Sequence, residues 1–256
     1  MKVDLWSVIL MKLHIQKGKR MNQIIRNVRD ELKQAADDKT KKGFQKFFKE
    51  EVKCHGVKAA AAVKIAKKYF PQVQGLGKGK TFDLCDELFE SGYCEEVWVA
   101  ANWAWWFRKD FQPDDFKVFE TWIKKYISNW AQCDTLCNHT VGSFMEQYPQ
   151  YIDNLKKWAE SQNRWMRRGA AVSLIIPAKE DKFLKDIFEL AGILLRDNDD
   201  MVQKGYGWML KEASCLHQTE VFEYVMMHKD KIPRTALRYA IEKMPPEFKK
   251  KAMKKD

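Results

Sequence analysis

The stretch Asn163-Arg-Trp-Met-Arg-Arg168 decides the fold of this chain, because similar stretches recur at a nearly constant interval. Asn129-Trp-Ala-Gln-Cys-Asp134 begins 34 residues earlier, and Asn198-Asp-Asp-Met-Val-Gln-Lys204 begins 35 residues later. The asparagines Asn129, Asn163 and Asn198 each lie near the expected start of a longer helix. We therefore expect each stretch to open a helix.

A second helix is predicted to follow each of these helices, over residues 150–159, 181–195 and 220–228, where apolar residues recur at helical spacing. A helix pair repeated every 35 residues or so is typical of a stacked solenoid, here closer to HEAT repeats than to tetratricopeptides. The alternative is an irregular bundle of helices of similar length. We expect an all-α solenoid of HEAT-like helix pairs, curved, with a basic concave face.

Helical spacing also characterises the apolar residues elsewhere, and no stretch alternates as a strand does. The stripes are Ile24, Ile25, Val28 and Leu32; Phe44, Phe47, Phe48 and Val52; Phe116, Phe119, Trp122, Ile123 and Tyr126; and Phe183, Ile187, Leu190, Ala191 and Leu194. The Gly-rich stretch 70–80 predicts a flexible connection after a helix that begins near Lys58. The expected N-caps are Asp114, Ser128, Ser161 and Asp197.

The 256 residues suit a single HEAT-like domain over 1–256, with an extra amphipathic N-terminal helix in 1–19 and a Lys-rich, frayed tail over 247–256. The net charge of +11 favours a polyanionic partner, which leaves nucleic acid, an anionic membrane surface and an acidic protein as candidates. No apolar run reaches the roughly 18 residues needed to span a bilayer, and no signal peptide is evident. We expect an intracellular, cytoplasmic protein.

The six cysteines do not predict a metal site. None of them forms a C-x-x-C pair. Cys133 and Cys137 share a helical face near His139, but a zinc site requires four ligands and usually closer pairs. We expect reduced, buried cysteines and no bound metal.

The repeated helix starts carry side chains that could perform chemistry on a nucleic acid. They are Trp130, Asp134, Arg164, Arg168, Lys204, Trp208 and Lys211. In a stacked array these residues would line one surface, where cations neutralise phosphates and indoles face a cationic base. A lone Asp134 could stabilise positive charge on a sugar as a glycosidic bond breaks. The alternative is that the tryptophans are core residues and that Asp134 is a surface charge near a helix start.

Four segments together resemble the AlkD-like DNA alkylation repair enzymes. They are Asn129-Trp-Ala-Gln-Cys-Asp134, Asn163-Arg-Trp-Met-Arg-Arg-Gly-Ala-Ala171, Val202-Gln-Lys-Gly-Tyr-Gly-Trp-Met-Leu-Lys-Glu212 and Arg234-Thr-Ala-Leu-Arg-Tyr-Ala240. The resemblance runs from about Asp37 to Met244. It implies HEAT-like repeats around duplex DNA and monofunctional removal of cationic alkylpurines such as N3-methyladenine and N7-methylguanine.

The resemblance also implies roles for individual residues. The catalytic aspartate of the family falls on Asp134, its two active-site tryptophans on Trp130 and Trp208, and its phosphate-binding arginine on Arg168. An aromatic residue near the lesion falls on Phe47, where a tyrosine would be expected.

Three hypotheses follow, in order of preference. The first is a DNA glycosylase of base excision repair that acts on alkylated duplex DNA as a monomer without any cofactor. In this hypothesis Arg168, Arg164, Lys204 and Lys211 hold the DNA backbone. The alternative is a non-catalytic HEAT-like protein that recognises damaged or branched DNA. The third is a scaffold that binds an acidic protein.

Overall fold

Helices make up all the regular structure of the chain in the computed structural model, which describes residue 21 and residues 23–254. The all-α prediction is therefore confirmed. The extra N-terminal helix predicted within residues 1–19 lies outside the described residues. In the part of the chain that is described, no helix is long and apolar enough to cross a membrane.

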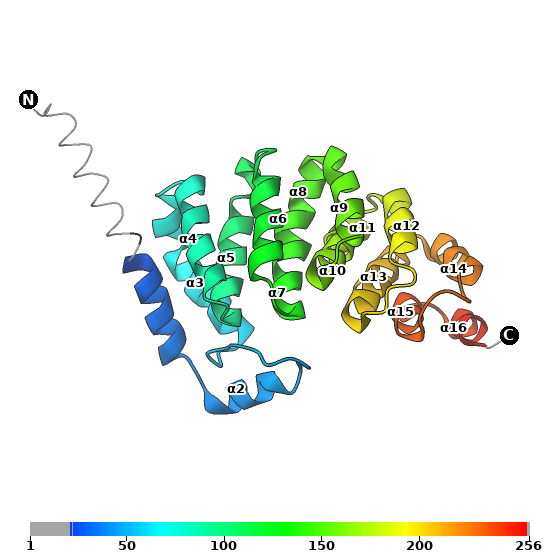
Figure 1. The fold of residues 1–256 in the computed structure, drawn as a ribbon, viewed down its shortest axis with the longest axis horizontal. Coiled ribbons are helices and arrows are strands. Elements are labelled where there is room, and N and C mark those ends of the chain that lie inside the picture. The colour runs from blue at the N-terminus through cyan, green and yellow to red at the C-terminus, as the bar shows by residue number, and fades with distance from the viewer. Residues whose placement is uncertain (1–20, 22, 255–256) are drawn as a thin grey trace, which may run out of the picture. The chain divides into compact units, whose positions relative to one another are not determined.

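The chain divides into two compact units, Met1–Phe107 and Arg108–Asp256. The helices of the first unit are residues 23–34, α2 (Asp38–Gln45), α3 (Ala59–Gln74), α4 (Lys78–Glu90) and α5 (Cys94–Trp106) (Figure 1). The α-helices of the second unit are α6 (Asp115–Tyr126), α7 (Trp130–Thr135), α8 (Gly142–Gln147), α9 (Ile152–Ala159), α10 (Arg164–Val172), α11 (Ile175–Lys179), α12 (Leu184–Ile193), α13 (Asp200–Ala213), α14 (Gln218–Met227), α15 (Arg234–Ala240) and α16 (Pro246–Met253). Its shorter turns are η1 (Arg108–Asp110), the π-helical η2 (Leu136–Val141) and η3 (Pro149–Tyr151).

Three of the four predicted apolar stripes face the core for most of their length. The stripe from Phe44 to Val52 is wrong as a helix, because α2 ends at Gln45. The Gln45 side chain donates to the carbonyl of Glu50 and accepts from the N–H of Val52, and these bonds turn the chain back after the helix. Phe47 lies on this turn and is 76% exposed.

The flexible connection predicted over residues 70–80 is also wrong. Helix α3 continues through Pro71 to Gln74, and α4 already begins at Lys78. Gly77 makes the short turn between them with a φ of 85°, a left-handed conformation that favours glycine. The Thr81 hydroxyl bonds to the carbonyl of Gly77 at 2.9 Å and to that of Val73 at 3.1 Å, which fixes the turn against both helices.

The second unit is built of two layers of helices. In the first, which we call layer A, α7, α10, α13 and α15 contact one another in that order (Figure 1). The second, layer B, contains α6, α9, α12 and α14; α9 packs on α12, α6 and α9 pack on α10, and α12 and α14 pack on α13. This arrangement confirms the predicted stack of helix pairs.

The helices of layer A begin at an almost constant interval, after the cap residues Asn129, Asn163, Asp199 and Pro233. Asn129 accepts from the N–H of Gln132 at 3.0 Å, and Asn163 accepts from that of Trp165 at 2.9 Å, so the asparagines themselves cap these helices. The third helix starts after Asp199 instead of Asn198, because the Asp199 carboxylate accepts from the Met201 N–H at 2.8 Å.

The N-caps predicted at Ser128, Ser161 and Asp197 are wrong by one or two residues. Ser161 and Asp197 do bind backbone N–H groups, but those of Asn163 and Asp199, so they hold the turn that leads into each cap. Asp114 occupies the cap position of α6 without a side-chain bond to the helix.

Glycines allow the helices of layer A to approach closely. A Cβ atom on Gly169 of α10 would lie 3.1 Å from the Cys137 sulfur, and one on Gly207 of α13 would lie 2.7 Å from the Cβ of Tyr239 on α15. A Cβ on Gly205 would lie 3.3 Å from Cγ of Arg168. Glycines therefore permit close packing of α10 against η2, of α13 against Arg168 of α10, and of α13 against α15.

Residues 247–253 are not a frayed tail as predicted, because they form most of helix α16. Phe248 stacks on Phe222 of α14 with ring centroids 4.2 Å apart, and Ala252 is buried. Burial of these apolar groups holds the helix against α14 despite its lysines.

Five of the six cysteines are buried and unbridged, as expected, whereas Cys215 is exposed at the end of α13. Cys133 and Cys137 lie where α10 packs against α7 and η2, next to Gly169. Within the described residues, no group of three or more histidine, cysteine or acidic side chains is arranged to hold a metal ion.

Candidate active site

Asp134 and Arg168 form the centre of the candidate site. Asp134 lies in the last turn of α7 and Arg168 in the middle of the neighbouring α10. Nε of Arg168 donates to Oδ1 of Asp134 at 2.8 Å, and Nη2 donates to Oδ2 at 2.7 Å. Because two parallel bonds join the groups, the guanidinium fixes the plane of the carboxylate as well as its position.

The pair is almost completely shielded from solvent, with exposed side-chain fractions of 14% for Asp134 and 6% for Arg168. Burial raises the pKa of Asp134 above its ordinary value, and the charge and hydrogen bonds of Arg168 offset only part of that rise. Burial alone would lower the pKa of Arg168, but the charge of Asp134 raises it above its ordinary value. The guanidinium therefore remains charged, and it is the main favourable partner of the Asp134 anion.

Equivalent positions in the repeat bring these residues together. Asp134 is the fifth residue after the cap Asn129, and Arg168 is the fifth residue after the cap Asn163. Lys204 holds the same position after Asp199, and Arg238 holds it after Pro233. We call these four residues the fifth-position row; it crosses all four helices of layer A. The 34-residue separation of Asp134 and Arg168 was the sequence signal for their contact.

Helix α13 supports the other side of Arg168. Nη1 of Arg168 donates a hydrogen bond to the carbonyl of Met201 in the first turn of α13. Gly205 lies against the arginine side chain, and a Cβ there would be 3.6 Å from Nη1. Three of the five guanidinium N–H donors are thus used, and two are left.

The two candidate tryptophans lie on α7 and α13, the helices on either side of α10. Trp130 is half-buried and precedes Asp134 by one turn of α7, and Trp208 is half-buried and follows Gly205 by three residues on α13. Positions three or four residues apart share a helical face, so each indole is on the face that carries the pair or its support.

Glu212 is part of this environment, and our sequence analysis assigned it no role. The indole N–H of Trp208 donates to its Oε1 at 3.1 Å, and Lys243 donates to its Oε2 at 2.7 Å. Burial favours a higher pKa for Glu212, but Lys243, Lys179 and the indole together lower it below the ordinary value. The sequence signal that could have identified Glu212 is its position one helical turn after Trp208.

The remaining candidate cations each have an acidic partner. Nε of Arg164 lies 2.8 Å from Oδ2 of Asp199, and its guanidinium also lies over the Trp165 ring. Lys204 is 3.4 Å from Asp200 on its own helix. A separate pair joins Lys211 to Glu242 at 3.1 Å, with the lysine turned toward α15 and over the Tyr239 ring. Lys211 therefore faces the next repeat.

Phe47 belongs to the first unit, whereas Asp134, Arg168, Trp130 and Trp208 belong to the second. Its exposed ring is available for contact with a ligand.

The arrangement can hold a carboxylate dry and oriented, and two N–H donors of its guanidinium partner make no hydrogen bond within the described residues. An oriented anion in a poorly solvated place stabilises developing positive charge more strongly than one in water. A group that becomes positive during a reaction, next to an anion such as a phosphate, fits both features.

Comparison with known proteins identifies the family of the chain. The model of the DNA alkylation repair enzyme family matches residues 28–244. A solved structure described as a predicted DNA alkylation repair enzyme from Enterococcus faecalis is similar in fold, with a TM-score of 0.73 at 16% sequence identity. The match covers 82% of this chain and 97% of that one. No curated protein matches. Because the family match spans most of its length, the chain belongs to the DNA alkylation repair enzyme family.

Proposed function

We propose that the protein is a monofunctional DNA glycosylase that removes cationic alkylated purines, such as N3-methyladenine and N7-methylguanine, from duplex DNA. One observation carries the proposal: the buried, bidentate Asp134–Arg168 pair at matching positions of adjacent repeats. Family membership supports the substrate class, since the family acts in DNA alkylation repair.

The chemistry needs only one carboxylate. An alkylated purine already carries a positive charge, so it leaves as a neutral base when the C1′–N bond breaks and the bonding pair moves to the base. The positive charge then develops on the sugar, where the Asp134 carboxylate stabilises it. Asp134 also orients a water molecule that adds to C1′ and releases a proton, which leaves an abasic sugar.

Arg168 has two functions in this proposal. Through Nε and Nη2 it holds the carboxylate, and its two unused N–H donors bind a phosphate of the strand that contains the lesion. A bound phosphate partly compensates the positive charge of the Arg168 guanidinium. The Asp134 anion is then more available to the sugar. Arg164, Lys204 and Lys211 add backbone contacts by exchanging Asp199, Asp200 and Glu242 for phosphates.

The aromatic residues contact the lesion. We propose that Trp130 and Trp208 lie against the alkylated nucleotide, because an electron-rich indole attracts a cationic base by roughly 0.5–2 kcal/mol. Phe47 adds a further ring without a hydroxyl. Asp134, Arg168, Trp130 and Trp208 all come from one chain, so a monomer suffices, and we propose that it acts inside the cell at the DNA without a cofactor.

An alternative is a non-catalytic protein that binds damaged or branched DNA. It is favoured by one observation: Arg168 occupies both oxygens of Asp134, so in the free protein the carboxylate is neutralised. In this alternative the pair is structural and the basic residues only bind phosphates.

The test is release of free base from duplexes that carry N7-methylguanine or N3-methyladenine, measured by chromatography. We expect release by the wild type, loss of release by Asp134→Asn, and unchanged release by the control Asp114→Asn, an exposed carboxylate at the start of α6. Duplex binding without release by the wild type would overturn the glycosylase proposal and favour the alternative.

A further inference from the structure

The fourth helix of layer A carries arginines that the proposed site does not use. Helix α15 begins with Arg234 and has Arg238 one turn later. The same i, i+4 pair occurs in α10 as Arg164 and Arg168, at the same two positions after the cap. The repeat therefore places one pair of arginines in each of two helices that flank α13.

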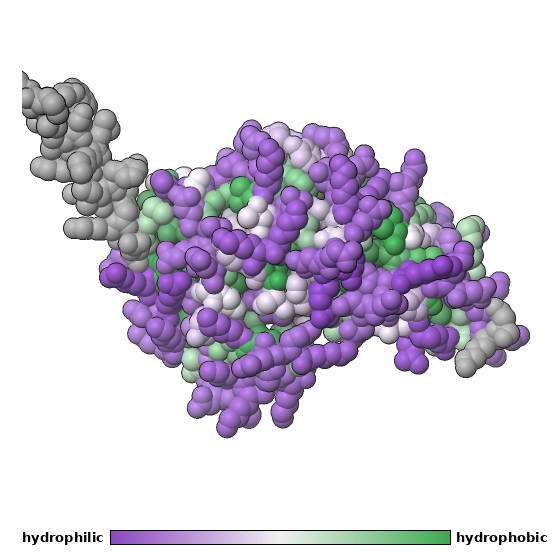
Figure 2. Space-filling model, in the orientation of Figure 1, coloured by the Kyte–Doolittle hydropathy of each residue, from purple (hydrophilic) through white to green (hydrophobic). Residues whose placement is uncertain are grey.

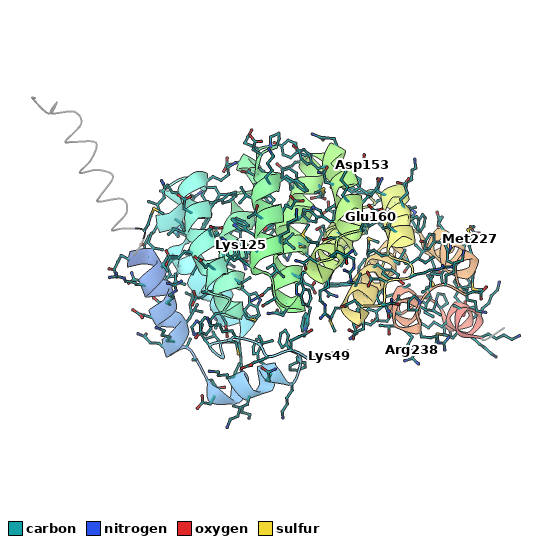
Figure 3. All side chains as sticks on the ribbon, viewed as in Figure 1. Lys49, Lys125, Asp153, Glu160, Met227 and Arg238 are labelled. Carbon is teal, nitrogen blue, oxygen red and sulfur yellow. The ribbon has the colours of Figure 1, made fainter. Side chains whose placement is uncertain are left out.

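The two pairs differ in their partners. Arg164 is paired with Asp199, and Arg168 is paired with Asp134. Arg234 is exposed and, within the part of the chain that the structure describes, donates only to the backbone carbonyl of Met253, at 3.3 Å. Arg238 is exposed too, and among the described residues it has no acidic partner. Figure 3 shows Arg238 at the lower edge of α15, directed away from the neighbouring helices.

A basic hollow adjoins this pair. It has a volume of about 530 Å³ and lies between the start of α15 and the end of α16. One acidic residue, Asp230, lines the hollow. Four cationic residues also line it: Lys229, Lys231, Arg234 and Lys254. Two apolar residues, Ile232 and Leu237, form part of the wall. The excess of positive charge favours an anionic group, and a row of phosphates provides one.

The position of Arg238 indicates which anion this is. It is the last residue of the fifth-position row, after Asp134, Arg168 and Lys204. A strand that passes Asp134 and follows this row therefore reaches Arg238 after three helix-to-helix steps. At roughly 8–10 Å a step, the path is about 24–30 Å. With about 3.4 Å between phosphates of one strand, this is about seven to nine base pairs.

We propose that Arg234 and Arg238, with the adjoining hollow, form a second phosphate-binding site that grips the DNA backbone about seven to nine base pairs from the lesion. This inference rests on the proposed function for its ligand, duplex DNA. The site contributes affinity and no chemistry, because no carboxylate comparable to Asp134 lies in its part of the row.

The first experiment measures affinity for an undamaged duplex of 24 base pairs at a series of salt concentrations. The slope of log K against log salt is negative, and each lost phosphate contact reduces its magnitude by about 0.9. We expect Arg234→Gln/Arg238→Gln to lower the magnitude of the slope by about two and the affinity at moderate salt by about tenfold. The matched control is Lys117→Gln/Lys157→Gln, which removes two exposed charges from α6 and α9 of layer B.

Arg238→Gln alone is included because it breaks no bond within the protein, whereas Arg234 also bonds to the end of α16. We expect it to lower the magnitude of the slope by about one. An unchanged slope for both variants, or an equal fall in the control, would overturn the inference while leaving base release as a separate test of the glycosylase. Absence of any duplex binding would overturn both.

The second experiment locates the contact. Single-turnover base release is measured on duplexes with the lesion central, or four base pairs from one end or from the other. The double variant should raise the half-saturating protein concentration about tenfold on the central duplex and on one off-centre duplex, with the maximal rate unchanged. On the other off-centre duplex, which lacks DNA at the second site, the variant should match the wild type. Equal effects on all three duplexes would contradict a contact at this distance.

Discussion

Two buried carboxylates, one in each unit, are held in different ways. Glu95 of α5 is fully buried and accepts backbone N–H bonds from His55, Gly56 and Val57 at 2.8–3.0 Å. Asp134 of α7 is also largely buried, but the guanidinium of Arg168 takes both of its oxygens. The first carboxylate is bound by backbone and the second by a side chain.

This difference in partners distinguishes a carboxylate that holds structure from one that is able to take part in chemistry. Backbone N–H groups in a turn cannot leave without unfolding it, and Gly56 holds this one at a φ of 97°, where a Cβ would collide with the Asp37 carbonyl. Glu95 therefore stabilises the turn that supports the start of α2. A guanidinium can exchange or share its partners, so Asp134 can change its interactions when a substrate arrives. The predictions below test this contrast, from the largest effect to the smallest.

The largest effect on stability is expected for Glu95→Gln. The amide nitrogen of glutamine donates, so at least one N–H of the turn would face a donor, at a cost of about 2 kcal/mol in the free energy of unfolding. Chemical denaturation measures this loss. The control Glu90→Gln changes an exposed residue of α4 and should stay within about 0.5 kcal/mol. Equal stability of the two variants would contradict a structural role for Glu95.

A smaller effect, on rate, is expected for Gly205→Ala. The new Cβ would press on the Arg168 side chain at 3.3 Å and shift the guanidinium by a few tenths of an ångström. Because misplacement of a positioning group slows catalysis, single-turnover base release should fall by about tenfold. Gly192→Ala in α12 meets only the Tyr224 hydroxyl at 3.7 Å and should not change the rate. A wild-type rate for Gly205→Ala would show that the position of Arg168 is not critical.

Glu212→Gln should lower the rate by about threefold through Trp208, because a weaker acceptor leaves the indole less firmly held. The effect should vanish when Trp208 is already phenylalanine, and a double-mutant cycle tests this coupling. The lowered pKa of Glu212 means that its ionised form stabilises the fold above the ordinary carboxyl range, and that this stability is lost as the pH falls through the lowered value. Additive effects of the two substitutions would contradict positioning of Trp208 by Glu212.

The smallest effect concerns His217, at the start of α14. A hydrogen bond from its ring to the Asp181 carboxylate raises its pKa above the ordinary value of 6.5. The protonated ring is therefore favoured in the folded protein, so its contribution to stability is complete below pH 6.5 and is lost as the pH rises through the raised value. NMR titration should show a lower His217 pKa in Asp181→Asn. An unchanged pKa would exclude Asp181 as the cause.

Most of layer A was predictable from the sequence, because Asn129 and Asn163 recur with the repeat near the helix starts, although the caps themselves were predicted one or two residues earlier. The contact between Asp134 and Arg168 was predictable in principle from their equal distance to those caps. It was missed because Arg168 was assigned to a phosphate alone. Sequence could not show that Arg164, Lys204 and Lys211 pair with acids, since long flexible side chains choose partners by three-dimensional proximity.

Errors about the first unit have local causes. Gln45 ends α2 by binding the backbone beyond it, and Thr81 holds α3 and α4 together across a short turn. Neither of these hydrogen bonds produces a periodic pattern in the sequence from which it could be predicted. The exposed position of Phe47 follows from the first of them.

The central claim is that Asp134 performs chemistry whereas Glu95 supports structure. The most direct test is the single-turnover rate of N7-methylguanine release by Asp134→Asn and Glu95→Gln, each normalised to the folded fraction, with duplex affinity measured alongside. The account predicts at least a hundredfold loss for Asp134→Asn with duplex affinity retained, and a rate within about threefold of wild type for Glu95→Gln. A near wild-type rate for Asp134→Asn would contradict the account.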